Sequence, residues 1–227
     1  MNEVKLTWRE RTSESEFVAS VWACSTPVAT ARTVLADPCI SIGLVREGGS
    51  TKVILRGPET KPHSKLLAPG YTCMAIRLQP GVLLRGFPVQ KFINSSLALP
   101  ADTASRFWFE GTRLQFPDFD HAELLIDQLY NLGYLSHRAS SSYNAQTAKI
   151  LSPRSYARLV KRITGFSPYR LYQLQRMHQA LRLLKQGTSA ASVAAELNFV
   201  DQSHLTHASR QFLGHTPKQL LRLPQIP

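Results

Sequence analysis

Short apolar runs with a period of two occupy the first half of the chain, and longer runs with helical spacing occupy the last third. Apolar residues alternate over 40–44, a glycine-rich turn follows at 47–50, and an extended run resumes over 52–55. This order is typical of a β-hairpin. Alternation returns over 74–78 and stops at Pro80-Gly81, so we expect several short strands separated by Gly/Pro turns.

A helix is predicted after this strand-rich stretch. Asp120 and Glu123 have the spacing of a capping box, and Gly133 offers a stop. The expected apolar face consists of Leu125, Leu129 and Leu132. This face fits either the core or a dimer contact, and the core is the first expectation. The segment 136–142 reads as a linker because it is rich in serine.

Each later apolar run begins after a capping residue and ends at a residue that tolerates the left-handed conformation. The predicted N-caps are Ser152, Ser167, Thr188 or Ser189, and Asp201, with a last turn at Thr216-Pro217. The predicted stops are Gly165, Gly187, Asn198 and Gly214. Ser-Pro and Thr-Pro pairs put proline at the first helical position, where its missing N–H is not needed.

These helices contain an internal repeat with an offset of 49 residues. Ser152 corresponds to Asp201, and Gly165-Phe166-Ser167-Pro168 corresponds to Gly214-His215-Thr216-Pro217. Each copy reads as a short helix, a tight turn, a capped helix and a stop, which is the pattern of a helix-turn-helix. A helix over 168–186 joins the copies. Two such units suit two successive major grooves, about 34 Å apart.

Charge is distributed unevenly along the chain, whose formal net charge is +12. Up to Ser136 there are 14 Lys/Arg and 13 Asp/Glu, whereas the remainder has 13 Lys/Arg and two acids, Glu196 and Asp201. A compact domain with this excess attracts a polyanion through counterion release. Nucleic acid is favoured over a membrane surface because no basic stretch adjoins a Trp/Phe-rich insertion face.

The expected fold class is α+β. Residues 1–118 would form a small antiparallel β domain, barrel-like or sandwich-like. Residues 119–142 would be a helix and linker. Residues 143–227 would form an all-α domain with two helix-turn-helix units joined by a linker helix.

Residues 194–205 read AAELNFVDQSHL, and Gly214-x-Thr216-Pro217 follows them. Leu151-Ser152-Pro153-Arg154 opens the first copy, and Arg176 with Ala180 lies on the joining helix. These motifs resemble the DNA-binding domain of the AraC/XylS family of transcriptional regulators, whose second unit usually reads A-x-x-x-G-F-x-D-x-S-H/Y-F and closes with G-x-[ST]-P. A weaker similarity to the N-terminal domain of some members rests on Asp37-Pro38-Cys39, Gly57-Pro58-x-Thr60-x-Pro62-His63 and Leu78-x-Pro80-Gly81.

Three positions depart from the family pattern. Asn198 stands where the family has glycine, Ser209 stands where an aromatic residue packs, and the first leading helix, 144–150, is short and poorly capped. Asparagine tolerates the left-handed turn. Phe212 or Leu213 would have to fill the core beside Ser209.

The resemblance implies which side chains meet DNA. The base-reading candidates, on helices 153–164 and 202–212, are Arg154, Ala157, Arg158, Gln202, Ser203, Thr206 and His207. The phosphate candidates are Ser152, Lys161, Arg162, Arg210 and Thr216. Arginine bonds guanine and glutamine bonds adenine, whereas Ser or Thr serves several bases. Contacts to phosphate position the protein without reading sequence.

Other chemistry is weakly supported. His204 and His207 are three residues apart, but no glutamate or third ligand accompanies them, so we expect no metal and no cofactor. Gly48-Gly49-Ser50 lacks the lysine of a P-loop and no nucleophile motif occurs, so we expect no enzyme. Aromatic residues that could line an effector pocket, although they more often form core, are Trp22, Phe87, Phe92, Trp108 and Phe109.

The resulting hypothesis is a sequence-specific DNA-binding transcriptional regulator without catalysis, modulated by a small-molecule effector or by oligomerisation. The alternatives are a β domain that itself acts on a ligand and a nonspecific nucleoid protein. A monomer and a homodimer both fit. Three widely spaced cysteines, the lack of a secretion signal, and the lack of any apolar run of about 18 residues predict a cytoplasmic, nucleoid-associated protein.

Overall fold

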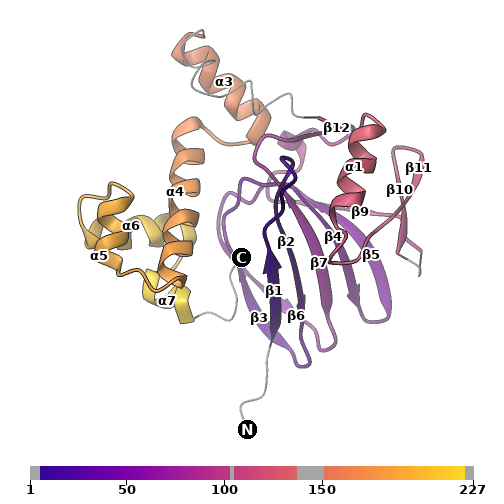
Figure 1. The fold of residues 1–227 in the computed structure, drawn as a ribbon, viewed down its shortest axis with the longest axis horizontal. Helices are drawn as coiled ribbons and strands as arrows, with labels where there is room; N and C mark the ends of the chain where they lie inside the picture. The colour runs from indigo at the N-terminus through magenta and orange to yellow at the C-terminus, as the bar shows by residue number, and fades with distance from the viewer. Residues whose placement is uncertain (1–5, 103–104, 137–150, 223–227) are drawn as a thin grey trace.

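The computed structural model describes residues 6–102, 105–136 and 151–222 (Figure 1). Its N-terminal region consists of short antiparallel strands, as the alternation predicts. The strands are β1 (Thr7–Arg11), β2 (Val18–Ser25), β3 (Thr30–Val34), β4 (Ser41–Glu47), β5 (Ser50–Arg56), β6 (His63–Leu67), β7 (Thr72–Leu78), β8 (Leu83–Leu84), β9 (Ser96–Leu99), β10 (Arg106–Phe109), β11 (Thr112–Gln115) and β12 (Leu135–Ser136), with a 3-10 turn η1 (Val89–Lys91). The expected hairpin is confirmed, since Gly48 and Gly49 turn β4 into β5 with φ of 56° and 76°.

Six strands form one antiparallel sheet in the order β1-β2-β7-β4-β5-β9, and β3 pairs with β6 in a separate ribbon. Alternate residues face opposite sides of the sheet. Ile42 packs into the main apolar cluster, which also receives helix α1 (Glu123–Asn131). Val45 and Cys73 pack on the other side, with Leu67 of the ribbon. Both faces of the sheet are therefore covered.

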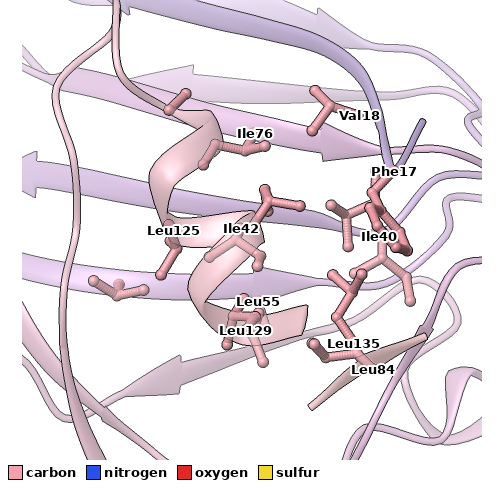
Figure 2. Packing of buried hydrophobic residues seen from close by; sticks show 14 of the residues in the cluster. Phe17, Val18, Ile40, Ile42, Leu55, Ile76, Leu84, Leu125, Leu129 and Leu135 are labelled. Carbon is pink, nitrogen blue, oxygen red and sulfur yellow. The ribbon is translucent and has the colours of Figure 1, made fainter. Parts of the chain in front are cut away.

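Helix α1 closes the main apolar cluster (Figure 2). Leu125, Ile126 and Leu129 are buried, and Figure 2 shows Leu125 and Leu129 beside the strand residues of that cluster. This face of the helix therefore belongs to the core. Leu132 does not share it, contrary to expectation, and is 42% exposed. The reason is that α1 ends at Asn131, so Leu132 is the C-cap residue and the buried stripe stops before it.

The capping box expected from Asp120 and Glu123 does not form, so that prediction was wrong. The N-cap of α1 is Ala122, which makes no side-chain hydrogen bond. Asp118 instead accepts hydrogen bonds from the backbone N–H groups of Asp120 and His121, at 3.1 Å and 2.9 Å. The Asp118 side chain, two residues before Asp120, thus stabilises the turn that precedes the helix.

Glu123 accepts hydrogen bonds from Arg11 of β1 and from Ser13 just after it, instead of forming the capping box. Both terminal nitrogens of Arg11 donate to its carboxylate at 2.7 Å, and the Ser13 hydroxyl donates at 2.6 Å. The hydrogen bonds from Arg11 contribute most to lowering the pKa of Glu123 to about 2. A bidentate pair with an arginine gives the carboxylate two charge-assisted bonds where a capping box would give it one, which explains why the long-range contact prevails.

The C-terminal region is helical, as the capped apolar runs predict. Its helices are α3 (Pro153–Thr164), α4 (Pro168–Lys185), α5 (Ala190–Glu196), α6 (Gln202–Leu213) and α7 (Pro217–Arg222). Their apolar faces meet in a second cluster that includes Leu174, Met177 and Leu205. The linker predicted up to residue 142 and the leading helix predicted over 144–150 lie outside the described residues.

An antiparallel β region followed by a helical region confirms the predicted α+β class. The domain boundaries after residues 118 and 142 stay predictions. Among the described helices, none has the length and apolarity that crossing a membrane would require.

Replacing Glu123 with glutamine should lower the free energy of unfolding by about 1–2 kcal/mol at neutral pH, because the charge-assisted bonds are lost. The pKa of Glu123 lies below its ordinary value of 4.5. The contribution of Glu123 to the free energy of unfolding is therefore present above pH 4.5 and is lost as the pH falls toward 2. Urea unfolding at neutral and acidic pH measures both effects. Asp127→Asn, on the exposed side of the same helix, should change little, and an equal loss in both variants would contradict the assignment.

Candidate nucleic-acid interface

Helices α3 and α6 have matching ends at positions 49 residues apart. Ser152 Oγ accepts a hydrogen bond from the N–H three residues on at 3.3 Å, and Asp201 Oδ1 accepts the equivalent one at 2.7 Å. Both helices end at a left-handed glycine, Gly165 (φ 80°) and Gly214 (φ 78°). The internal repeat is confirmed at both ends of each helix.

Helices α5 and α6 form a helix-turn-helix, and the joining helix α4 holds its turn in place. Asn198 occupies the turn with φ of 58°, as expected of asparagine there. Arg176 of α4 donates to the carbonyl oxygens of Leu197, at 2.8 Å, and Asn198. Its guanidinium carbon lies 3.6 Å from the centroid of the Phe199 ring. One arginine of α4 therefore holds the turn of the second unit by hydrogen bonds and stacking.

The departure at Ser209 is accommodated inside the core. Ser209 is fully buried, and its hydroxyl donates to the carbonyl oxygen of His215 at 2.7 Å, so the polar group is satisfied. Phe212 and Leu213 are both buried beside it, as the sequence led us to expect.

His204 has a structural role in the second unit. Its Nδ1 accepts a hydrogen bond from the N–H of Val200 at 3.2 Å, and its ring meets that of Phe199 edge-on, with centroids 5.5 Å apart. This nitrogen is therefore occupied in fixing the start of α6. Within the described ranges, no cluster of three His, Cys, Asp or Glu side chains is placed to hold a metal ion.

The residues predicted to meet DNA lie on α3 and α6 or at helix starts. Exposed among them are Ser152, Arg154, Arg158, Lys161, Arg162, Gln202, Ser203, His207 and Arg210; half-buried are Ala157, Thr206 and Thr216. None of the arginines and lysines in this set forms an ion pair with a described residue. Their charges are available to an external anion. Arg162 differs in that it borders a groove whose other wall, with Phe87 and Val89, belongs to the N-terminal region.

An extended segment of the N-terminal region docks on α4. Leu35 and Ala36 are buried in the second apolar cluster, among residues of the helices. The Nε2 of His178 donates to the carbonyl oxygen of Ala36 at 2.8 Å. The next residue, Asp37, is anchored in the β region by Arg77, whose Nε donates to it at 2.6 Å.

Loops of the N-terminal region also lie against the glycines that end α3 and α6. A methyl group added at Gly165 would lie 3.0 Å from Ile93, and one added at Gly214 would lie 2.7 Å from Pro62. Both glycines also have positive φ, so side chains there are disfavoured twice over. The N-terminal region therefore touches the two repeat units at equivalent positions.

Sequence reasoning missed this contact between the regions. The spacing places His178 on the apolar face of α4 but does not indicate its partner. The nearest signal is the motif over 57–63, which supports the weaker family similarity. In the structure, the carbonyl oxygen of Thr60 accepts a hydrogen bond from Arg170, and Pro62 lies at Gly214.

The five aromatic residues considered for an effector pocket mostly serve other purposes. Phe87 and Phe109 are buried in the main cluster, and Phe92 stacks on Phe87 with ring centroids 3.6 Å apart. Trp108 is 51% exposed. Trp22 alone of the five borders an internal cavity of the β region.

Comparison with known families agrees with this geometry. The profile described as "Helix-turn-helix domain" matches residues 148–223. The C-terminal region is an AraC-type helix-turn-helix domain. A protein of Escherichia coli (strain K12) named "Uncharacterized HTH-type transcriptional regulator YidL" is 41% identical over 66 residues, which is 29% of this chain. The match spans only 22% of that relative's length.

Two solved structures of ToxT from Vibrio cholerae are similar over nearly the whole chain. The wild-type protein with bound unsaturated fatty acid gives a TM-score of 0.44 at 10% identity, covering 100% of this chain and 98% of that one. The P21 form gives a TM-score of 0.40 at 10% identity, covering 97% and 98%. Because both scores are below 0.5, the AraC-type assignment rests on the family profile and on the helix geometry above.

Acidification should loosen the docking of the N-terminal region on the AraC-type domain. Burial and the nearby Arg77 lower the pKa of His178 below 6.5, although Asp37 opposes this; Arg182 also faces the ring. The unfolded chain then binds more protons, so this stability is present above about pH 6.5 and is lost as the pH falls below it. Thermal unfolding should show a Tm several degrees lower at pH 5.5 than at pH 7.5.

A matched pair of variants isolates the histidine. His178→Gln should remove most of this pH dependence, whereas His207→Gln, exposed on α6, should keep it. Full retention of the acid-induced fall in His178→Gln would show that another group is responsible.

Proposed function

We propose that this protein is a sequence-specific DNA-binding transcriptional regulator, not an enzyme, with α3 and α6 as its recognition helices. The observation that carries the proposal is the set of exposed cations on these two helices, none of which pairs with a described carboxylate. Double-stranded DNA supplies phosphates for such charges, and their neutralisation releases counterions.

The joining helix supports simultaneous contact with two grooves. α4 has 18 residues, so it is about 27 Å long at 1.5 Å per residue. Figure 1 shows α3 at one end of α4 and the α5–α6 pair at the side of it. Successive major grooves on one face of DNA are about 34 Å apart. One chain thus suits two adjacent major grooves.

The side chains on α3 and α6 suit base reading. Arg154 and Arg158 suit guanine, and Gln202 suits adenine. Ser203, Thr206 and His207 add hydrogen-bonding groups, and Ala157 can contact a thymine methyl group. Lys161, Arg162 and Arg210 would hold phosphates, together with the helix starts at Ser152 and Thr216.

The contacts of the N-terminal region with the helices support a regulatory role for it. It binds α4 at Ala36 and touches the glycine stops of α3 and α6. A ligand in the β region, or its association with a second chain, would act on DNA binding by changing these contacts. A regulator of this kind works on the chromosome, so we place the protein in the cytoplasm.

Selection of bound fragments from a genomic library by the full chain tests the proposal. Fluorescence anisotropy should then show a preference of about 10³ or more for the selected site over scrambled DNA. Two protected segments about 10 bp apart are expected. Footprint length separates one bound chain from two. Equal, steeply salt-dependent binding to every fragment would overturn the proposal in favour of a nonspecific nucleoid protein.

Single substitutions should separate base reading from phosphate binding. Arg158→Ala or Gln202→Ala should weaken binding to the selected site by about 1–3 kcal/mol and relax the preference. Lys161→Ala should weaken binding to all sequences alike and reduce the salt slope by about 1. Anisotropy over a salt series measures both quantities, and Lys52→Gln, exposed on β5, is the control. Equal weakening on selected and scrambled DNA by Arg158→Ala would contradict its role.

A further inference from the structure

A cavity of about 80 Å³ lies between the six-stranded sheet and the β3–β6 ribbon. Its lining residues with ionic side chains are Arg32, Arg56, Lys65, Arg77, Asp37 and Glu59, and His178 also borders it. The two carboxylates in this lining each lie next to an arginine other than Arg32. Asp37 binds Arg77 at 2.6 Å, and Glu59 lies 3.6 Å from Arg56.

Arg32 of β3 stands out because it is buried without an anion. It is 8% exposed, and its Nε has no hydrogen-bond partner in the described part of the chain. No described carboxylate lies within ion-pair distance of it. Its guanidinium instead lies 4.6 Å and 4.8 Å from the ring centroids of Trp22 and Trp8. An aromatic ring is a weak partner for an N–H group, so the Nε–H of Arg32 remains available to an anionic acceptor.

A second cation faces Arg32 across the ribbon. Lys65 of β6 is its direct cross-strand partner, so the two side chains share a face. Like charges opposite each other destabilise a strand pair. Burial lowers the pKa of both groups, and Arg56 lowers that of Lys65 further. An anion between them would offset both costs.

We infer that this cavity binds a small anion, held by the N–H edges of Arg32 and by Lys65, with the Trp22 and Tyr71 rings as an apolar wall. The volume is about half that of the ~150 Å³ cavity that accepts benzene. It therefore suits a carboxylate or oxyanion of four or five heavy atoms, such as acetate or phosphate, and excludes a long acyl chain.

The site adjoins the contact between the two regions. Val34, Leu35 and His178 line the same cavity, and Leu35 and Ala36 dock on α4. An occupant would therefore touch the segment that binds the helices. A change in DNA affinity would follow from this, a consequence that rests on the proposed function, whereas the anion site itself does not.

Thermal unfolding of the full chain tests the site without DNA. Potassium acetate or potassium phosphate replaces potassium chloride at constant ionic strength. The Tm should rise saturably, by roughly 5 to 10 °C at a hundredfold excess over Kd. Decanoate, which is too long for the cavity, should have no effect.

Arg32→Met should abolish the response while leaving the Tm in chloride unchanged or higher, because it removes a buried cation that lacks a counterion. Lys52→Gln is the control for loss of a positive charge and should respond like the wild type. Lys65→Gln, which should weaken anion binding at least tenfold, provides an independent test if Arg32→Met does not fold.

Three results would overturn the inference. They are no saturable rise in the wild type with either anion, an equal rise in Arg32→Met, and a response to decanoate but not to acetate or phosphate. Hydrogen exchange gives a second readout, since acetate or phosphate should slow exchange over 34–37 in the wild type only. None of these measurements involves DNA, so failure here is distinct from failure of the proposed function.

Discussion

The docking of Leu35 and Ala36 on α4 is the contact on which the rest of the structure depends. α4 also packs the helices into one core and holds the turn of the second unit through Arg176. Because one helix receives all of these contacts, the β region and both recognition helices are positioned relative to each other. A buried carbonyl oxygen needs a donor, and His178 supplies it to Ala36.

The two regions use charge in opposite ways. In the N-terminal region several cations are paired with carboxylates, as in Arg11–Glu123 and Arg77–Asp37, and the buried Arg32 is the exception discussed above. On α3 and α6 the cations stand exposed and face no described carboxylate. Internal pairs tie strands and helices together, whereas unmatched surface charge raises affinity for a polyanion and speeds the encounter with it. The uneven charge along the chain therefore reflects a division between folding and binding.

Local signals in the sequence were sufficient for most elements. The hairpin around Gly48, the caps and stops of α3 and α6, and the left-handed Asn198 all follow from interactions within a few residues. Long-range contacts were not predictable in this way. Arg11 donates hydrogen bonds to Glu123, which therefore does not form the expected cap. His178 donates to Ala36, which is 142 residues away in the sequence. Nothing in the sequence around Arg32 indicates a buried cation either.

Arg32 and the docking contact lie on one continuous piece of chain. Ala36 lies four residue steps after Arg32, a span of at most about 13 Å at 3.3 Å per residue. Hydrogen bonds hold this piece at intervals, since β3 pairs with β6 and Asp37 exchanges two backbone bonds with Glu59. A buried cation that stability alone does not explain points to a functional position, and this one lies on the segment that docks on the helices.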